Sequence, residues 1–133
     1  MEILIAIIAA GIIMGVLDFI WLGFIAKKVY YGEMGDILLK KPNMVPALVF
    51  YAIYVIGSVL LVVVPALEIE SWQHAFGMGA LLGFVAYATY DLTNLATLKG
   101  FSQKIVVIDL IWGTFITAVV SLGAFAAATW LIG

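Results

Sequence analysis

Long apolar stretches separated by short polar segments dominate the sequence. Runs of about 20 apolar residues are typical of helices that cross a bilayer. The runs predict four spans, at residues 3–26, 45–64, 75–98 and 103–131. Pro65 is expected to end the second span. The sequence therefore predicts an all-α fold, an integral membrane four-helix bundle in a single domain over 1–133, with residues 27–44 as an interfacial loop.

The composition agrees with a location in a lipid bilayer. Hydrophobic residues make up 66% of the chain and charged residues 11%, whereas about a quarter of the residues of soluble domains are charged. There is no cysteine, which excludes disulfides, thiolate metal sites and cysteine nucleophiles. The net charge of -2 and the membrane class exclude nucleic-acid binding. No basic region precedes residues 3–26, so this segment is expected to be a retained span and not a removed signal peptide.

The lysines predict the orientation of the bundle. The six basic residues all lie in the first and third connections: Lys27, Lys28, Lys40, Lys41, Lys99 and Lys104. The second connection carries only Glu68, Glu70 and His74. Because basic loops stay in the cytoplasm, we expect the first and third connections there and both termini on the non-cytoplasmic side. This bias also argues against a dual-topology dimer, which needs balanced charge.

Three aspartates interrupt the spans at a similar depth. At 1.5 Å per residue, Asp18, Asp91 and Asp109 lie about 13, 12 and 8 Å from the nearest lysine of the adjoining cytoplasmic loop. A charged side chain in hydrocarbon costs at least about 2.5 kcal/mol, so each should face the bundle interior and have a partner. The sequence predicts one shared polar site in the cytoplasmic leaflet. The alternative is that these residues are interhelical hydrogen-bonding groups that fix packing.

The third predicted span has the densest polar segment. At helical spacing Tyr87, Asp91 and Asn94 share one side of the helix, with Tyr90 and Thr93 beside them. We predict Asp91 as the central acceptor of the site. Asn94 and Thr93 are predicted to orient the ligand.

A similar Asp-x-x-Trp pattern occurs in the first and fourth spans. Asp18 with Trp21 and Asp109 with Trp112 are both i, i+3 pairs on one helix face. Both lie toward the cytoplasm, which argues against an inverted repeat, because such a repeat would send one aspartate to each leaflet. The likeness indicates either two walls of one pocket or chance. Tyr51, like Tyr54, is expected either to line that pocket or to lie at its cytoplasmic rim.

Glycines spaced four residues apart predict close helix contacts. Gly79 with Gly83, and Gly11 with Gly15, each form a small-xxx-small face that lets a neighbouring helix approach.

The polar positions together resemble a bacterial family of predicted four-span membrane proteins of unknown function. The matching residues are Asp18-x-x-Trp21, Asn43, Phe50-Tyr51, Tyr54, Tyr87-x-x-Tyr90-Asp91-x-Thr93-Asn94-x-Ala96-Thr97 and Asp109-x-x-Trp112-Gly113. Phe101 departs from the pattern, which has a tryptophan there. The resemblance implies a multi-pass protein of the bacterial inner membrane. It supplies no activity, and it adds Asn43, at the cytoplasmic mouth of the second span, to the site.

The carboxylates allow more than one chemistry. Neighbouring carboxylates in a low dielectric cannot all stay ionised without counter-charges, which suits proton handling. With amide and hydroxyl oxygens, the candidates Asp18, Asp91 and Asp109 could also hold Mg²⁺ or Mn²⁺. No D-D-x-x-D, H-E-x-x-H or G-x-S-x-G motif is present, and the sequence has no arginine for phosphate binding. No cofactor is therefore assigned.

The leading hypothesis is a pocket that binds or transports a small polar molecule, an ion or a lipid headgroup, with proton coupling. Its predicted residues are Asp18, Trp21, Asn43, Tyr51, Tyr87, Tyr90, Asp91, Thr93, Asn94, Asp109 and Trp112. Transport by so small a bundle would need a homo-oligomer. The alternatives are a membrane-embedded enzyme acting on a lipid or isoprenoid, and a structural accessory subunit.

Overall fold

The structure is a computed structural model that describes residues 1–25 and 44–132. The predicted interfacial loop at 27–44 therefore lies almost wholly outside the described residues, as does Asn43.

The described chain forms four candidate membrane spans and no strand, which confirms the all-α, four-span prediction. The first span is α1 (Glu2–Ile20), which continues as a π-helical turn, η1 (Trp21–Ile25). The second consists of α3 (Met44–Ser58), a second π-helical turn, η2 (Val59–Val63), and α4 (Val64–Glu68). The third and fourth are α5 (Trp72–Thr97) and α6 (Gln103–Ile132).

Short connections with defined caps join the later helices. The Ser71 hydroxyl accepts a hydrogen bond from the His74 N–H at 3.1 Å and caps the start of α5. Ser102 does the same for α6 by accepting from the Ile105 N–H at 3.2 Å. Between the helices Gly100 has a φ of 76°, a left-handed conformation that favours glycine. The short connection between Thr97 and Gln103 makes α5 and α6 antiparallel neighbours.

The second span does not end at Pro65, contrary to the sequence expectation. The Val64 N–H donates to the Val59 carbonyl, five residues back, so the helix is widened immediately before the proline. In a regular α-helix the proline ring would clash with the carbonyl four residues back, and the wider turn relieves this clash. Pro65 then lies in the first turn of α4, and the span continues to Glu68.

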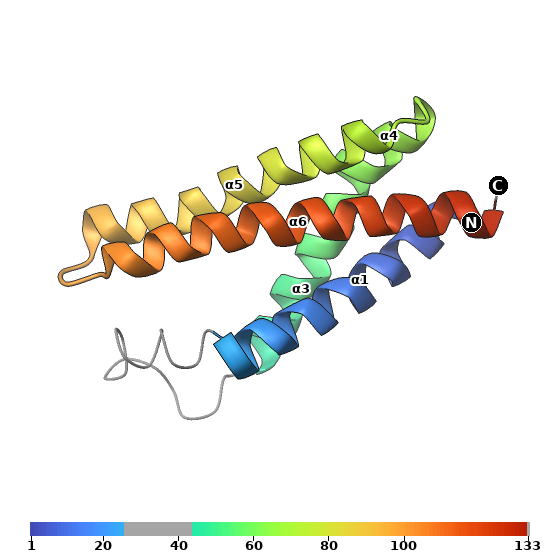
Figure 1. Ribbon diagram of the computed structural model, residues 1–133. Coiled ribbons are helices and arrows are strands. Elements are labelled where there is room, and N and C mark those ends of the chain that lie inside the picture. The colour runs from blue at the N-terminus through green and yellow to red at the C-terminus, as the bar shows by residue number, and fades with distance from the viewer. Residues whose placement is uncertain (26–43, 133) are drawn as a thin grey trace.

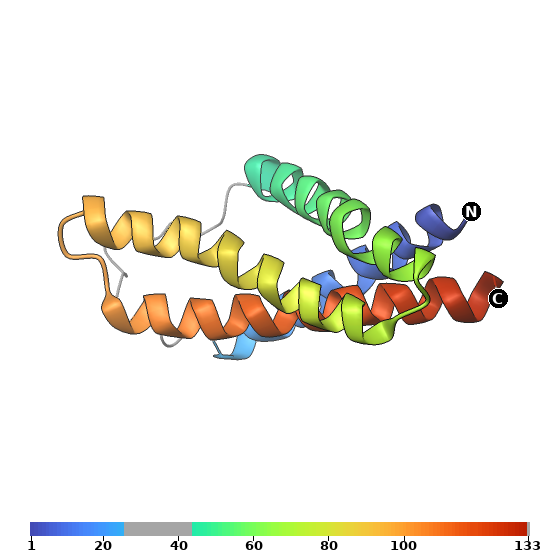
Figure 2. The ribbon, with the colours of Figure 1, turned by 90° about the horizontal axis from the view of Figure 1, so that it is seen from above.

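The bundle is built on the α5–α6 pair, which α1 crosses on one side (Figure 1). Seen from above, α3 lies apart from the start of α6 and approaches the pair toward its own end (Figure 2). The two termini lie at the same end of the molecule (Figure 1).

Small residues let α5 and α6 approach closely. A Cβ added at Gly79 would lie 2.7 Å from the Ser121 Oγ, and one added at Gly83 would meet the Gly113 carbonyl oxygen. The prediction for this glycine pair is therefore confirmed. The prediction for Gly11 and Gly15 is wrong, because both are exposed and have no atom within 4 Å of an added Cβ.

The apolar core fills the half of the bundle that holds both termini. In α1 it is formed by Ala6, Ala10 and Met14, which recur every four residues and so share one face. They pack in one cluster with η2 and with the second half of α6, from Ile116 onward. The opposite half of the bundle, where α1 ends and α6 begins, contains the buried aspartates.

Gly83→Ala should destabilise the bundle by about 1–3 kcal/mol, because the new methyl group overpacks the α5–α6 contact. Gly77→Ala on the same helix is the matched control, since no atom lies within 4 Å of its added Cβ. The free energy of unfolding in mixed detergent micelles measures the difference. Equal stability of the two variants would contradict the close contact.

Candidate functional site

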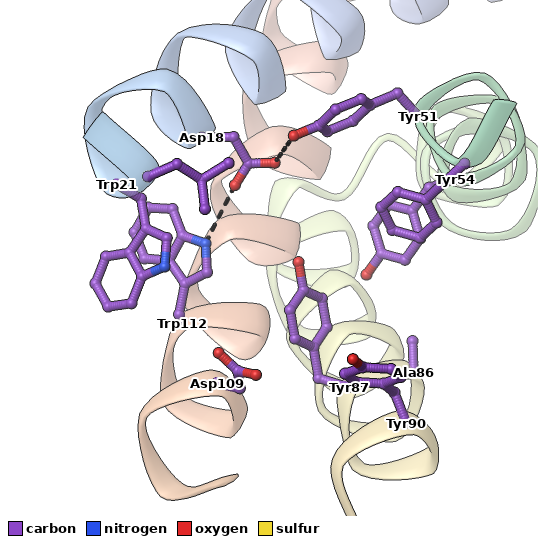
Figure 3. Close-up of a pocket in the computed structure, with 11 residues that line it drawn as sticks. Asp18, Trp21, Tyr51, Tyr54, Ala86, Tyr87, Tyr90, Asp109 and Trp112 are labelled. Carbon is purple, nitrogen blue, oxygen red and sulfur yellow. Dashed lines mark hydrogen bonds between the residues drawn. The ribbon is translucent and has the colours of Figure 1, made fainter. Parts of the chain in front are cut away.

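A cavity of about 430 Å³ lies among α1, α3, α5 and α6, in the half of the bundle opposite the termini. Its lining is mostly aromatic, with two carboxylates (Figure 3). The described lining residues are Asp18, Trp21, Leu22, Phe50, Tyr51, Tyr54, Ala86, Tyr87, Tyr90, Asp109 and Trp112. Segments far apart in the sequence therefore meet at one hollow.

Asp18 connects three helices at the wall of this cavity. Its side chain is 8% exposed, and each carboxylate oxygen accepts one hydrogen bond (Figure 3). The Tyr51 hydroxyl donates to Oδ2 at 2.8 Å from α3, and the Trp112 Nε1–H donates to Oδ1 at 3.3 Å from α6. The partners that a buried carboxylate requires are thus supplied by two other spans.

The two Asp-x-x-Trp segments meet in space. The rings of Trp21 and Trp112 are stacked, with centroids 4.4 Å apart and planes 7° from parallel. Both tryptophans and both aspartates of the motif line the same cavity. This geometry is that of two similar walls of one pocket.

Asp109 lies on the wall opposite Tyr51, and its carboxylate points into the cavity (Figure 3). The side chain is 8% exposed. Among the described residues no donor bonds its carboxylate, in contrast to Asp18. The cavity therefore contains one carboxylate fixed by two donors and one that faces the open space with no partner in the described part of the chain.

Tyrosines from α3 and α5 form the remaining wall. The hydroxyls of Tyr54 and Thr117 share a hydrogen bond of 2.6 Å, which ties α3 to α6. The rings of Tyr54 and Tyr87 make an edge contact with centroids 6.4 Å apart. Tyr51 and Tyr54 both line the cavity, a question that the sequence left open. Sequence reasoning missed Phe50 as a lining residue, although its place one turn before Tyr54 was a usable signal.

Asp91 does not line the cavity, although the sequence predicts it as the central acceptor. It is 0% exposed, and neither of its carboxylate oxygens has a hydrogen-bond partner within the described part of the chain. The reason lies in the helical register: Gly79, Gly83, Tyr87 and Asp91 are spaced by four residues and form the stripe of α5 that packs on α6. Tyr87 lies against Gly113, and in an antiparallel pair one further turn of each helix would bring Asp91 to the level of Asp109.

The other predicted residues of α5 also lie outside the cavity lining. Thr93 is exposed and Asn94 is half-buried, and neither lines the hollow. Within residues 1–25 and 44–132, no group of three or more His, Asp or Glu side chains is placed to hold a metal ion. Asp18, Asp91 and Asp109 are thus not assembled as a metal-ligand cluster, although all three are buried. The site combines carboxylates, phenols and aromatic faces, and no described lining residue is basic.

A family of predicted membrane proteins, DUF2177, matches residues 3–126 of the sequence. The chain belongs to the DUF2177 family. This confirms the resemblance to a membrane protein family of unknown function, and four apolar helices agree with it. No curated protein and no solved structure matches this DUF2177 protein.

Tyr51→Phe should destabilise this DUF2177 protein by about 1–2 kcal/mol, because Asp18 keeps only one of its two donors. Tyr90→Phe is the matched control: Tyr90 also lines the cavity, but it is 61% exposed and no described residue bonds its hydroxyl. The control should change the free energy of unfolding by less than about 0.5 kcal/mol. A loss of the same size in both variants, measured in detergent, would show that the Tyr51–Asp18 bond has no special role.

Proposed function

We propose that this membrane protein binds a small polar molecule, an ion or a lipid headgroup in the cavity next to Asp18. The observation that carries the proposal is a hollow of about 430 Å³ whose wall contains a carboxylate held by donors from two other helices. Pockets for small ligands have volumes of about 300–1,000 Å³ and combine apolar walls with a few placed polar groups. An interhelical hydrogen bond that served packing alone would not need an open hollow beside it.

The residues of the proposed site differ from the set predicted from the sequence. The fixed part of the proposed binding wall consists of Asp18, Trp21, Tyr51 and Trp112. Asp109 is the carboxylate for which the described residues supply no partner. Movement of the ligand across the bilayer would require a homo-oligomer, because one small bundle encloses little volume beyond this cavity.

We also propose a bacterial inner-membrane location with the cavity in the cytoplasmic leaflet. The distribution of charged residues supports this orientation, because basic loops stay in the cytoplasm. Lys99 and Lys104 flank the connection at the cavity end, whereas Glu68 and Glu70 lie at the end that holds the termini.

Single-cysteine variants test this orientation, since the native chain has no cysteine. In intact bacterial cells a membrane-impermeant maleimide should label Glu68→Cys, whereas Leu98→Cys should react only after the membrane is permeabilised. Both residues are exposed, and neither change removes a lysine. The reverse labelling pattern would place the cavity in the outer leaflet and overturn the proposed location.

Ala86→Phe tests the binding role by filling the cavity. In native mass spectrometry of the protein extracted from its membrane, the wild type should carry a bound small molecule or lipid, and the bound fraction should fall at least tenfold in the variant. Ala52→Phe is the matched control, because Ala52 is exposed on α3 and does not line the cavity. Equal bound fractions in all three proteins would favour a purely structural role.

A further inference from the structure

The charged residues that the structure describes in the cavity lining are all of one sign. Asp18 and Asp109 both line it, and none of the described lining residues carries a positive charge. Asp109 is 8% exposed, points into the hollow and has no hydrogen-bond partner among the described residues (Figure 3). Among the described residues Asp109 therefore lacks the compensating partner that a buried ionised carboxylate requires, and a bound cation would supply that partner.

The other walls are aromatic. The described aromatic lining residues are Trp21, Phe50, Tyr51, Tyr54, Tyr87, Tyr90 and Trp112. The negative face of an aromatic ring attracts cations, and cages of such rings recognise quaternary ammonium groups. The same faces repel anions. A hard metal ion would instead need about six oxygen ligands, and the described residues offer no such cluster.

Building on the proposed ligand-binding role, we propose that the cavity binds an organic ammonium group, with Asp109 as its charge partner and the aromatic side chains as its walls. Two sources share this chemistry: a free quaternary amine and the ammonium headgroup of a lipid.

We infer that the cavity opens laterally, between α3 and α5. Phe50 on α3 and Tyr90 on α5 both line the hollow, yet they are 46% and 61% exposed. The opening at these two rings therefore faces the surroundings of the bundle. A headgroup could enter there without leaving the membrane.

The cavity tryptophans provide a direct readout. The chain has four tryptophans, and Trp72 and Trp130 do not line the cavity. In the Trp72→Phe, Trp130→Phe double variant, the remaining fluorescence comes from Trp21 and Trp112. This reporter protein, in phosphatidylglycerol nanodiscs, is titrated with choline and with 3,3-dimethyl-1-butanol, an uncharged molecule of the same shape. Sodium chloride and sodium phosphate are the salt and anion controls.

Choline should change the fluorescence saturably and raise the thermal unfolding midpoint, with an affinity at least tenfold above that of the alcohol. In phosphatidylcholine nanodiscs, loss of the choline response indicates that lipid headgroups already occupy the site. A response that persists there indicates a free amine. Either result supports ammonium binding.

Asp109→Asn should weaken choline binding at least tenfold and leave binding of the alcohol unchanged. Tyr90→Leu, which removes an exposed ring and no described hydrogen bond, should weaken choline severalfold and provides a second test if the first variant does not fold. Glu68→Gln makes a similar charge change in an exposed side chain at the other end of the bundle and should have no effect.

Two outcomes overturn the inference, and they have different consequences. If the alcohol or phosphate binds the reporter as well as choline does, the ammonium assignment fails while the ligand-binding role stands. If no probe binds and Ala86→Phe loses no bound species, the proposed function fails as well.

Discussion

A buried carboxylate needs hydrogen-bond partners inside a bilayer, and this need determines how the helices are arranged in the half of the bundle that contains the cavity. Hydrocarbon offers Asp18 no hydrogen bonds, so its oxygens accept from Tyr51 and Trp112 on two other helices. Within α3 only Val55 and Ser58 are buried, so its side chains contribute little to the apolar core. The Asp18–Tyr51 bond and the Tyr54–Thr117 bond are therefore principal attachments of the first half of α3 to the bundle.

The helices are held together differently in the two halves of the bundle. Around Ala6, Ala10 and the second half of α6, small apolar residues allow close packing, and the interior is filled. At the other end, large aromatic side chains and two aspartates line a hollow. The close glycine contacts of α5 with α6 bridge both regions, so the pair acts as a common support on which α1 and α3 are placed.

The number of spans and their approximate bounds were predictable, because an apolar run of sufficient length has no stable alternative to a helix in a bilayer. The i, i+3 spacing of Asp18 and Trp21, matched in the fourth span, left open whether the two segments form walls of one pocket or are alike by chance. The position of Asp91 outside the cavity lining was not predictable. Adjacent faces of one helix differ by a single residue, and only the register with α6 decides which face packs against that helix. A glycine pair such as Gly11 and Gly15 shows that close approach is possible, but it does not show that a neighbour is present.

The lateral opening that we infer at Phe50 and Tyr90 has a thermodynamic consequence for any amphiphile that uses this cavity. Its local concentration is set by partitioning between water and lipid, not by its concentration in solution. Each methylene of an alkyl chain adds about 0.8 kcal/mol to membrane affinity, so a longer chain raises apparent occupancy without a single new contact to the protein. For a ligand of the proposed kind, occupancy would depend on the composition of the surrounding leaflet. Chain length would change its affinity, while the aromatic walls and Asp109 would determine selectivity.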